Sequence, residues 1–258
     1  MLFLRSLLFN IVFFVNMAVL MLIWLPALVM PRQASLSLGR AWGRTSLWWL
    51  EKIVGLKVEF RGLENIPKGA IIVACKHQSI WDTFVLPLHF PDFSYILKHE
   101  LVFIPFFGWY LMSAEQIGID RAKGGRVLPQ ITTKAKALFA QGRQLFIFPE
   151  GTRRPAGAPA QYKFGVAHIY RETGAPCVPV ALNSGLFWPR RSFIVRPGTV
   201  VLEYLPPIEP GLEARAFFEL LQQTIETASD RLIEEAVAQD PSLAAIVARN
   251  RDAAAATA

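Results

Sequence analysis

The sequence predicts an α/β protein in which a mixed, partly parallel sheet is flanked by helices and is preceded by an N-terminal hydrophobic membrane helix and an interfacial helix. Short apolar runs alternate with helical stretches after Gly55, which is the pattern of α/β proteins. Two of these runs, 70–75 and 144–148, do not alternate with polar residues, as expected for strands buried on both faces. A long uncharged segment precedes them. With 258 residues, the chain can hold one catalytic domain and an appendage, or two small domains.

The composition excludes disorder and disfavours a freely soluble enzyme. Hydrophobic residues make up 53% of the chain and charged residues 18%, whereas soluble domains are about a quarter charged. The net charge of +7 favours an anionic partner, and the small number of charges favours a membrane surface over nucleic acid. Cys75 and Cys177 are far apart and form no C-x-x-C motif, so the sequence indicates neither a disulfide framework nor a metal site. A reducing, cytoplasmic setting is therefore expected.

The first hydrophobic segment, from Leu7 to Met30, carries no charged residue. A helix of this length would extend about 36 Å, enough to cross a hydrocarbon core of about 30 Å. A cleaved signal peptide would have a shorter apolar region ending in small residues, whereas Pro31 and Arg32 follow here. Arg5 alone precedes the segment and several basic residues follow it. The positive-inside rule therefore places the rest of the chain on the cytoplasmic face of the inner membrane.

A second helix, between Ser35 and Leu56, is expected to lie at the membrane interface. Tryptophan on one side would sit at the headgroup level, and arginine on the other side would lie near lipid phosphate. The apolar face consists of Leu38, Trp42, Trp49 and Ile53, and the charged face of Arg40, Arg44 and Glu51. The same pattern describes a helix packed on the globular domain, and a two-helix unit buried in one leaflet also fits.

The catalytic domain is expected over residues 56–210, between membrane-associated helices at 1–55 and a C-terminal segment at 211–258. Strands are predicted for the short apolar runs, at 57–60, 70–75, 93–97, 116–120, 144–148, 177–183 and 200–204. Helices are predicted for the stretches with helical periodicity, at 80–87, 104–113, 126–140, 164–173 and 215–237. Beyond Pro241 the alanine-rich tail is expected to be frayed.

A histidine and an aspartate follow the predicted strand at 70–75. Five helical steps of about 100° would leave His77 and Asp82 roughly 140° apart, so one regular helix cannot place both on one face. With His77 on a turn and Asp82 in the first turn of the next helix, the carboxylate can accept the Nδ1 hydrogen and leave Nε2 free as a general base. Alternatively, Asp82 caps the helix in the S-x-x-D pattern that begins at Ser79, and His77 is an ordinary polar residue.

A charged loop follows the predicted strand at 144–148. Glu150 could hold hydroxyl groups, Gly151 permits a tight turn, and the Arg153 guanidinium can bind a phosphate through two parallel hydrogen bonds. Arg121, at the end of another strand, could contribute to the same anion site. A solvated loop and a surface arginine are the alternatives. Because α/β proteins bind ligands in loops beyond strand ends, this loop is a candidate binding site.

The order of these motifs resembles that of the glycerolipid acyltransferases, and most closely that of the bacterial 1-acyl-glycerol-3-phosphate acyltransferase family. The likeness rests on H-x4-D at His77 and Asp82, Arg121, F-P-E-G-T-R at 148–153 and V-P-V at 178–180. It covers roughly residues 56–207. H-x4-D alone is a weak signal, but joined with F-P-E-G-T-R in this order it is highly specific.

The resemblance implies an enzyme of phospholipid biosynthesis that moves a fatty acyl chain from an acyl thioester to the sn-2 hydroxyl of lysophosphatidic acid, giving phosphatidic acid. The acyl donor would be acyl-CoA or acyl carrier protein, with no further cofactor and no covalent enzyme intermediate. Membrane lipids are the expected partners, and nucleic acid is not. By the same resemblance, His77 and Asp82 are the catalytic residues, and Glu150, Gly151, Thr152, Arg153 and Arg121 bind the acceptor.

One position departs from the family pattern. The family's second motif usually has a glycine six positions before its arginine, and Glu115 occupies that place, with Gly118 nearby. Acylation of a lyso-ornithine lipid or of another lysophospholipid is therefore an alternative. From a different class, the chain could be a non-catalytic membrane-surface binding protein. A serine hydrolase is disfavoured because no G-x-S-x-G motif is present, and Cys75 fits a core cysteine better than a nucleophile.

Overall fold

The sheet at the centre of the molecule combines parallel and antiparallel strands. In the part of the chain that the computed structural model describes, residues 1–120 and 125–255, seven strands form one sheet in the order β1-β7-β6-β2-β5-β3-β4. They are β1 (Leu56–Arg61), β2 (Ile71–Cys75), β3 (Phe93–Lys98), β4 (Ile117–Ile119), β5 (Gln144–Ile147), β6 (Cys177–Leu182) and β7 (Gly198–Tyr204). Neighbouring strands are parallel, except that β7 runs antiparallel to β6. The expected mixed, partly parallel sheet is confirmed.

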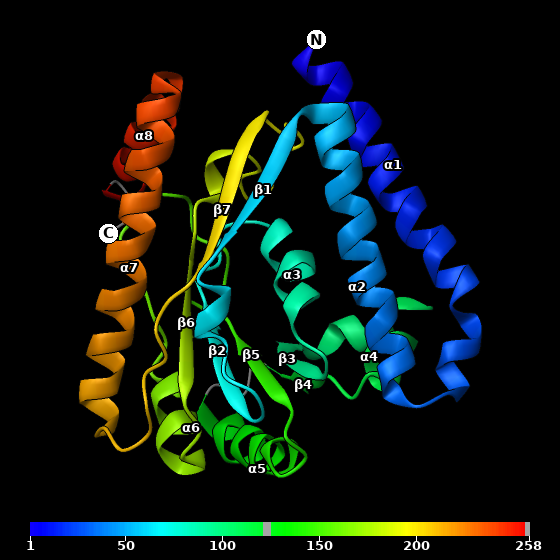
Figure 1. Ribbon diagram of the computed structural model, residues 1–258, viewed down its shortest axis with the longest axis vertical. Coiled ribbons are helices and arrows are strands. Elements are labelled where there is room, and N and C mark those ends of the chain that lie inside the picture. The colour runs from blue at the N-terminus through cyan, green and yellow to red at the C-terminus, as the bar shows by residue number, and fades with distance from the viewer. Residues whose placement is uncertain (121–124, 256–258) are drawn as a thin grey trace.

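Helices cover both faces of this sheet (Figure 1). They are α1 (Leu2–Ile23), α2 (Arg32–Trp49), α3 (Trp81–Val85), α4 (Phe107–Ser113), α5 (Leu128–Phe139), α6 (Gly165–Thr173), α7 (Ala214–Gln239) and α8 (Ala244–Ala255). Successive strand residues point to opposite faces. Val73 and Phe146 accordingly pack with residues of α1, α2 and α3, whereas Ile72 and Leu145 pack with residues of α5, α6 and α7. The strands β2, β5 and β6 are buried along their whole length, as their continuous apolar runs predict.

The N-terminal helix α1 lies along the globular domain with one side packed and the other exposed. Phe9 and Phe13, on its inner side, are buried, and their rings contact Trp188 of the domain at centroid distances of 5.4 Å. The helix ends at Ile23, and a short 3₁₀ turn over Leu25–Val29 follows it. The proline of that turn, Pro26, cannot continue the α-helical hydrogen-bond pattern.

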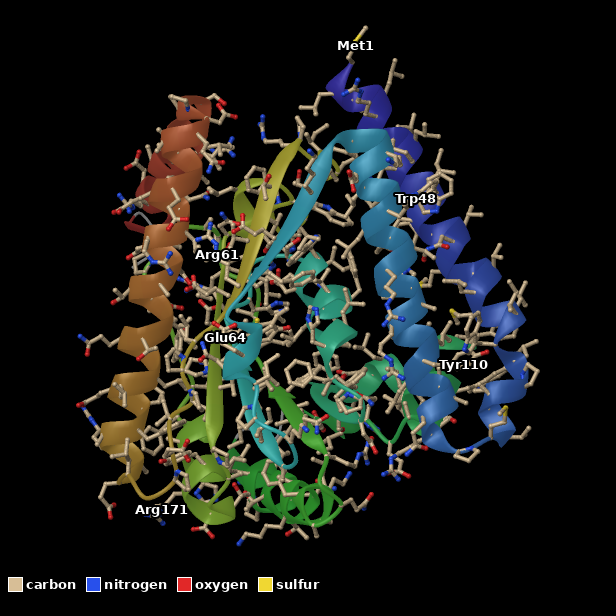
Figure 2. The ribbon with its side chains drawn as sticks, viewed as in Figure 1. Met1, Trp48, Arg61, Glu64, Tyr110 and Arg171 are labelled. Carbon is tan, nitrogen blue, oxygen red and sulfur yellow. The ribbon has the colours of Figure 1, made fainter. Side chains whose placement is uncertain are left out.

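The outer side of α1 is apolar. Among the described residues, α1 is the one helix long and apolar enough to cross a membrane, and 28% of its most apolar 18-residue stretch is buried in the protein. Side chains along this side point away from the rest of the molecule (Figure 2). The exposed ones include Leu4, Leu8, Ile11, Phe14 and Leu22. An exposed apolar surface of this extent indicates membrane association.

The tryptophan face of α2 packs within the protein, so the expectation that this face meets lipid headgroups is wrong. Trp42 contacts the rings of Phe13 and Phe84, with centroids 5.1 and 5.4 Å apart, and Leu38 is buried. Arg40 donates a hydrogen bond to the Pro91 carbonyl at 3.0 Å. The helix lies between α1 and α3, and the apolar pattern reflects these two partners instead of a bilayer.

The C-terminal residues form a helix that packs on the domain through its part before the alanine-rich end, the segment expected to be frayed. Helix α8 follows α7 after a short 3₁₀ turn, and Leu243, Ile246 and Val247 are buried against the core. Asn250 Nδ2 donates to the Ala156 carbonyl at 3.0 Å. The helix is ordered because an apolar stripe at i, i+3 and i+4 finds a surface in the loop around Ala156.

Candidate active site

The candidate site lies where β2, β5 and β6 end. These strands are mutually parallel, because β2 pairs in parallel with both β5 and β6, and their carboxyl ends therefore meet at one edge of the sheet. His77 follows β2, Glu150 follows β5 and Ser184 follows β6. In open α/β sheets this edge is the usual place for ligand binding.

His77 and Asp82 are joined as the sequence predicts. His77 Nδ1 lies 3.0 Å from Asp82 Oδ2, and the Asp82 side chain is fully buried. The same oxygen accepts the backbone N–H groups of Gln78 at 2.7 Å and Ser79 at 2.8 Å. The Asp82 carboxylate accepts hydrogen bonds and donates none. His77 Nδ1 therefore carries the hydrogen of this pair, and Nε2 is left as an acceptor. Asp82 therefore holds both the turn before α3 and the imidazole, so the two interpretations of its role are compatible.

Residues that follow β5 and β6 also contact this pair and its turn. The Ser184 hydroxyl donates to Asp82 Oδ1 at 2.5 Å, and the Gly185 N–H donates to Gln78 Oε1 at 2.9 Å. The His77 ring stacks on Phe148, with centroids 3.8 Å apart and planes 17° from parallel. The imidazole is thus fixed on one face by a ring and at Nδ1 by a carboxylate.

Glu150 does not have the surroundings of a substrate ligand. Its side chain is buried, Oε1 accepts from Lys76 Nζ at 2.9 Å, and Oε2 accepts from the His77 backbone N–H at 3.0 Å. Burial raises the pKa of Glu150, and the nearby Lys76 charge only partly opposes this rise. Because both oxygens already have donors, Glu150 holds the His77 turn, and hydroxyl binding, the role first expected for it, is not what this geometry favours.

Lys76 connects this turn to helix α7. Its side chain is buried, and its ammonium lies 2.6 Å from Glu226 Oε1 in addition to its contact with Glu150. The Tyr162 hydroxyl donates to the same Glu226 oxygen at 2.8 Å, and burial raises the pKa of Tyr162, which keeps that hydrogen in place. A buried cation between two carboxylates is well paired, so this network fixes the main chain immediately before His77.

The loop after β5 is anchored to the same turn. Gly151 has φ +67°, a conformation that L side chains adopt at a cost, and its N–H donates to the Phe148 carbonyl at 2.9 Å. The Arg154 N–H donates to the His77 carbonyl at 2.8 Å. The glycine is therefore required by the turn that brings Thr152 and Arg153 beside His77.

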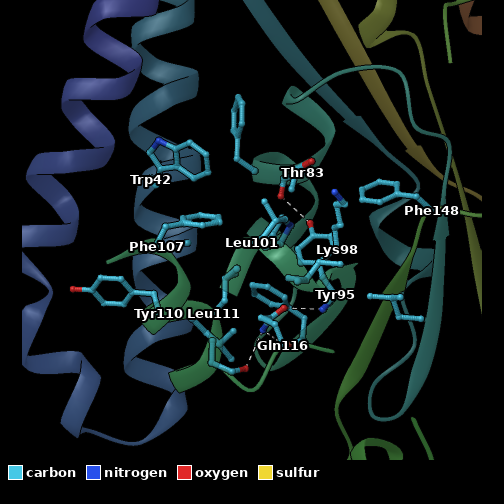
Figure 3. A pocket seen from close by; sticks show the side chains of 18 of the residues that line it. Trp42, Thr83, Tyr95, Lys98, Leu101, Phe107, Tyr110, Leu111, Gln116 and Phe148 are labelled. Carbon is cyan, nitrogen blue, oxygen red and sulfur yellow. Dashed lines mark hydrogen bonds between the residues drawn. The ribbon is translucent and has the colours of Figure 1, made fainter. Parts of the chain in front are cut away.

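A cavity of about 410 Å³ begins at this site and extends between the sheet and the N-terminal helices. His77, Gly151, Thr152, Arg153 and Arg190 line its polar part. Most of the remaining lining is apolar (Figure 3): Trp42 projects from α2, Phe107 and Tyr110 from α4, and Tyr95 from β3. Met17, Met21, Leu38 and Leu111 belong to the same lining. The cavity therefore offers a polar end beside His77 and a mostly apolar interior.

The arginine expected to end β4 cannot be assessed, because Arg121 lies outside the described residues. Arg153 and Thr152, which the resemblance assigns to acceptor binding, both lie in the cavity lining. Burial lowers the pKa of Arg153, the negative charge of Asp82 raises it and the positive charge of Arg190 lowers it further. The Arg153 guanidinium therefore lies close enough to Asp82 to interact with its negative charge.

Glu115, which stands where the resemblance calls for glycine, keeps the backbone geometry of a glycine. Its φ is +52°, in the left-handed region, and its carboxylate pairs with Arg143, with Oε2 and Nη1 2.6 Å apart. The glutamate is thus accommodated in place of glycine by a strained backbone and by an ion pair outside the cavity lining. It gives no reason to expect a different acceptor.

Other candidates receive no support as reacting groups. Burial raises the pKa of Cys75 well above its usual value, and its thiol donates to the Lys76 carbonyl, so it belongs to the core. Within residues 1–120 and 125–255, no group of three or more His, Cys, Asp or Glu side chains is arranged to hold a metal ion.

Four residues of the site escape sequence reasoning: Lys76, Ser184, Arg190 and Glu226. Lys76 offered one signal, since a lysine ending a wholly apolar strand is expected to need a buried partner. Ser184, Arg190 and Glu226 offered none, because only the fold brings them within reach of a turn more than a hundred positions away.

Comparisons with known proteins agree with this geometry. The sequence model of the acyltransferase family matches residues 57–183. A 1-acyl-sn-glycerol-3-phosphate acyltransferase of Pseudomonas aeruginosa is 36% identical over 194 residues, which are 75% of this chain and 76% of that protein. An enzyme of the same name from Cocos nucifera is 33% identical over 206 residues, 76% of this chain and 65% of that protein. The chain thus spans slightly less than two thirds of the plant relative.

A solved structure resembles most of this fold. The crystal structure of the 1-acyl-sn-glycerophosphate (LPA) acyltransferase PlsC from Thermotoga maritima matches with a TM-score of 0.72 and 26% sequence identity. The match covers 89% of this chain and 95% of that one, and so includes more than the region around His77.

Proposed function

The chain belongs to the acyltransferase family of the 1-acyl-sn-glycerol-3-phosphate acyltransferases, and we propose that it transfers a fatty acyl chain from an acyl thioester to the sn-2 hydroxyl of lysophosphatidic acid, giving phosphatidic acid. One observation carries this assignment: a histidine oriented by a buried aspartate lies at the polar end of a cavity whose lining is otherwise mostly apolar. A lysolipid has the same two parts, a polar head with a free hydroxyl and a long apolar chain.

In the proposed reaction His77 is the general base. Its Nε2 takes the proton of the sn-2 hydroxyl while that oxygen attacks the thioester carbonyl carbon and forms the new ester bond. The carbon–sulfur bond then breaks, and the imidazolium returns the proton to the departing thiolate. Asp82 acts through His77: it accepts the Nδ1 hydrogen at 3.0 Å, which fixes the ring and stabilises the positive charge that forms on it.

Positioning groups hold His77 in place before substrate arrives. Glu150 accepts the His77 backbone N–H, Lys76 holds Glu150, and Ser184 holds Asp82. A preorganised base loses little free energy in reorganisation during the reaction. This arrangement needs no covalent intermediate, and Cys75 is buried away from the cavity lining.

The acceptor's phosphate would lie beside Arg153, and an acyl chain would follow the cavity toward α2 and α4. Arg153 can bind a phosphate with two parallel hydrogen bonds. Leu38, Trp42 and Tyr110 line the far part of the cavity and would contact the chain. The donor would be acyl-CoA or acyl carrier protein, and Arg121 is retained as a proposed second phosphate ligand.

The apolar outer side of α1 would embed in the inner membrane from the cytoplasmic face. Because Phe9 and Phe13, midway along α1, pack on the globular domain, we favour a helix that lies in one leaflet over one that crosses the bilayer. Arg32, after the helix, would then lie near the cytoplasmic headgroups. Such a placement brings the cavity close to its lipid substrate.

The experiment that tests the function is radiolabelled acyl transfer by the purified protein in detergent. Oleoyl-CoA is the donor, with oleoyl-acyl carrier protein in a parallel series, and the acceptors are lysophosphatidic acid, lysophosphatidylcholine and lyso-ornithine lipid. We expect lysophosphatidic acid to be acylated much faster than the other two. Preferred turnover of another acceptor would refute the substrate, and no turnover with either donor would refute the activity.

A further inference from the structure

We propose that Arg190 is a further ligand for the acceptor's phosphate, in addition to Arg153 and the proposed Arg121, and that Arg153 and Arg190 together select acceptors that carry a phosphate monoester. The inference rests on the proposed function and names a residue outside the motifs that suggested it. Arg190 lies in the loop that follows β6, and it lines the same cavity as His77 and Arg153. Its Nη1 donates to the Arg153 carbonyl at 3.2 Å, which brings the two arginines together.

The two guanidinium groups form a concentration of positive charge. Within the described residues, neither Arg153 nor Arg190 forms an ion pair with a carboxylate, whereas Arg61, Arg143 and Arg171 of the same domain do. The positive charge of Arg190 adds to burial in lowering the pKa of Arg153. Two neighbouring like charges beside an apolar cavity are unfavourable until an anion lies between them. An anionic ligand removes this repulsion, and it does so best if it carries two negative charges.

The loop of Arg190 is held rigidly. Trp188 is buried against Phe9 and Phe13 of α1, and the Val195 N–H donates to the Ser6 hydroxyl at 3.0 Å. The Ser192 N–H donates to the Pro189 carbonyl at 3.1 Å, closing a turn around Arg190. A guanidinium has five N–H donors, so the bond to the Arg153 carbonyl leaves others for a ligand. The main chain that carries Arg190 is therefore fixed before the ligand binds, and its exposed side chain is directed toward Arg153 by the bond to the Arg153 carbonyl.

The same loop also contacts the catalytic pair. Ser184, six positions before Arg190, donates to Asp82 Oδ1 at 2.5 Å. In lysophosphatidic acid, two carbons and one oxygen separate the sn-2 hydroxyl oxygen from phosphorus, so the phosphate and the base must lie close together. One loop therefore sets the position of the base and the position of the phosphate relative to each other.

The charge of the ligand explains the selectivity. A phosphate monoester carries about −1.5 to −2 charges at pH 7. The phosphodiester of lysophosphatidylcholine carries a single negative charge and is followed by a quaternary cation, and lyso-ornithine lipid has no phosphate. Two guanidinium groups match the monoester in charge and leave an excess of positive charge with either of the others.

The test compares Arg190→Gln with Arg191→Gln, a matched control at the adjacent arginine. Arg191 is exposed, has φ +58° and lies outside the cavity lining. For Arg190→Gln we expect the KM for lysophosphatidic acid to rise about 10- to 100-fold, with the KM for oleoyl-CoA unchanged. Arg190→Lys, which keeps the charge without the planar fork, should recover part of this loss. Arg191→Gln should resemble wild type.

Competition with small phosphates separates the phosphate from the rest of the lipid. Glycerol 3-phosphate and inorganic phosphate should inhibit wild type competitively against lysophosphatidic acid and inhibit Arg190→Gln at least about tenfold more weakly. Equal inhibition of both proteins would overturn the proposal, as would a rise in the KM for oleoyl-CoA alone, which would place Arg190 at the donor. If wild type prefers lysophosphatidic acid and Arg190→Gln keeps its KM, the inference fails while the proposed function stands.

Discussion

Ser184 and Asp82, which are 102 positions apart in the chain, share a hydrogen bond of 2.5 Å in the interior of the protein. Both side chains are fully buried. Ser184 occupies Oδ1 of the carboxylate, while His77 Nδ1 and two backbone N–H groups occupy Oδ2. With both oxygens engaged, the carboxylate cannot rotate, and the direction in which it holds the imidazole is determined by a loop that is distant in sequence and follows β6, the strand next to β2.

The first prediction concerns this hydrogen bond. Ser184→Ala should lower kcat about tenfold, because a hydrogen bond to a charged group contributes about 1.5–3 kcal/mol, and leave the KM for lysophosphatidic acid unchanged. Steady-state kinetics measure both constants. Ser229→Ala is the control, since Ser229 is also buried and its hydroxyl has no hydrogen-bond partner within the described residues. An equal loss of kcat in both variants would show that Ser184 has only a packing role.

The second prediction concerns the buried charge of Lys76. Lys76→Met leaves Glu150 and Glu226 without their shared cation and should lower the free energy of unfolding by about 3–5 kcal/mol. Adding Glu226→Gln should restore part of this loss, because one uncompensated carboxylate is removed. Chemical denaturation followed by circular dichroism measures the change.

Lys136→Met is the control for the loss of a lysine. Lys136 pairs with Glu172 at 3.4 Å on the surface, where such a pair contributes at most about 1 kcal/mol. If Lys76→Met were no less stable than Lys136→Met, the network that holds the His77 turn would not stabilise the folded protein.

The third prediction concerns the apolar part of the cavity. Leu38 is buried and lines the cavity, so Leu38→Trp should fill space that a long acyl chain needs. Acyl transfer with oleoyl substrates should fall more than transfer with decanoyl substrates. Leu8→Trp, on the exposed side of α1, should change neither rate. An unchanged ratio of the two rates in Leu38→Trp would place the acyl chain elsewhere.

The fourth prediction concerns the position that departs from the family pattern. Glu115→Gly should leave the preference for lysophosphatidic acid over lyso-ornithine lipid unchanged, because Glu115 faces Arg143 and its backbone already has a conformation suited to glycine. Parallel rate measurements with the two acceptors test this. A shift of the ratio toward the lyso-ornithine lipid would assign Glu115 a role in acceptor choice.

Sequence reasoning predicted the sheet well because each strand has a local signature. The runs at 70–75 and 144–148 are apolar at successive positions, and they became β2 and β5 at the centre of the sheet. His77 and Asp82 were also within its reach, because they are five positions apart and a single turn determines their geometry. Local pattern was sufficient wherever the interacting residues are close in sequence.

Sequence reasoning was insufficient where the outcome depends on distant partners. The face of α2 that carries Trp42 has the same periodicity whether it packs on Phe84 or on a bilayer, so periodicity could not choose between them. Glu150 has the residue type of a hydroxyl ligand, and only the approach of Lys76 reveals that its oxygens are engaged. The stripe of Leu243, Ile246 and Val247 was a helix signal, but the alanine-rich composition around it obscured the signal.

One measurement decides whether His77 is the general base: single-turnover acyl transfer from oleoyl-CoA to lysophosphatidic acid by wild type and by His77→Ala, with binding of lysophosphatidic acid measured separately. We expect the rate of the chemical step to fall about 10²- to 10⁴-fold in His77→Ala while the affinity for lysophosphatidic acid stays unchanged. Removing a general base lowers the rate by about 10²-fold or more. If the rate of His77→Ala at saturating substrate is within about threefold of wild type, His77 does not act as the base.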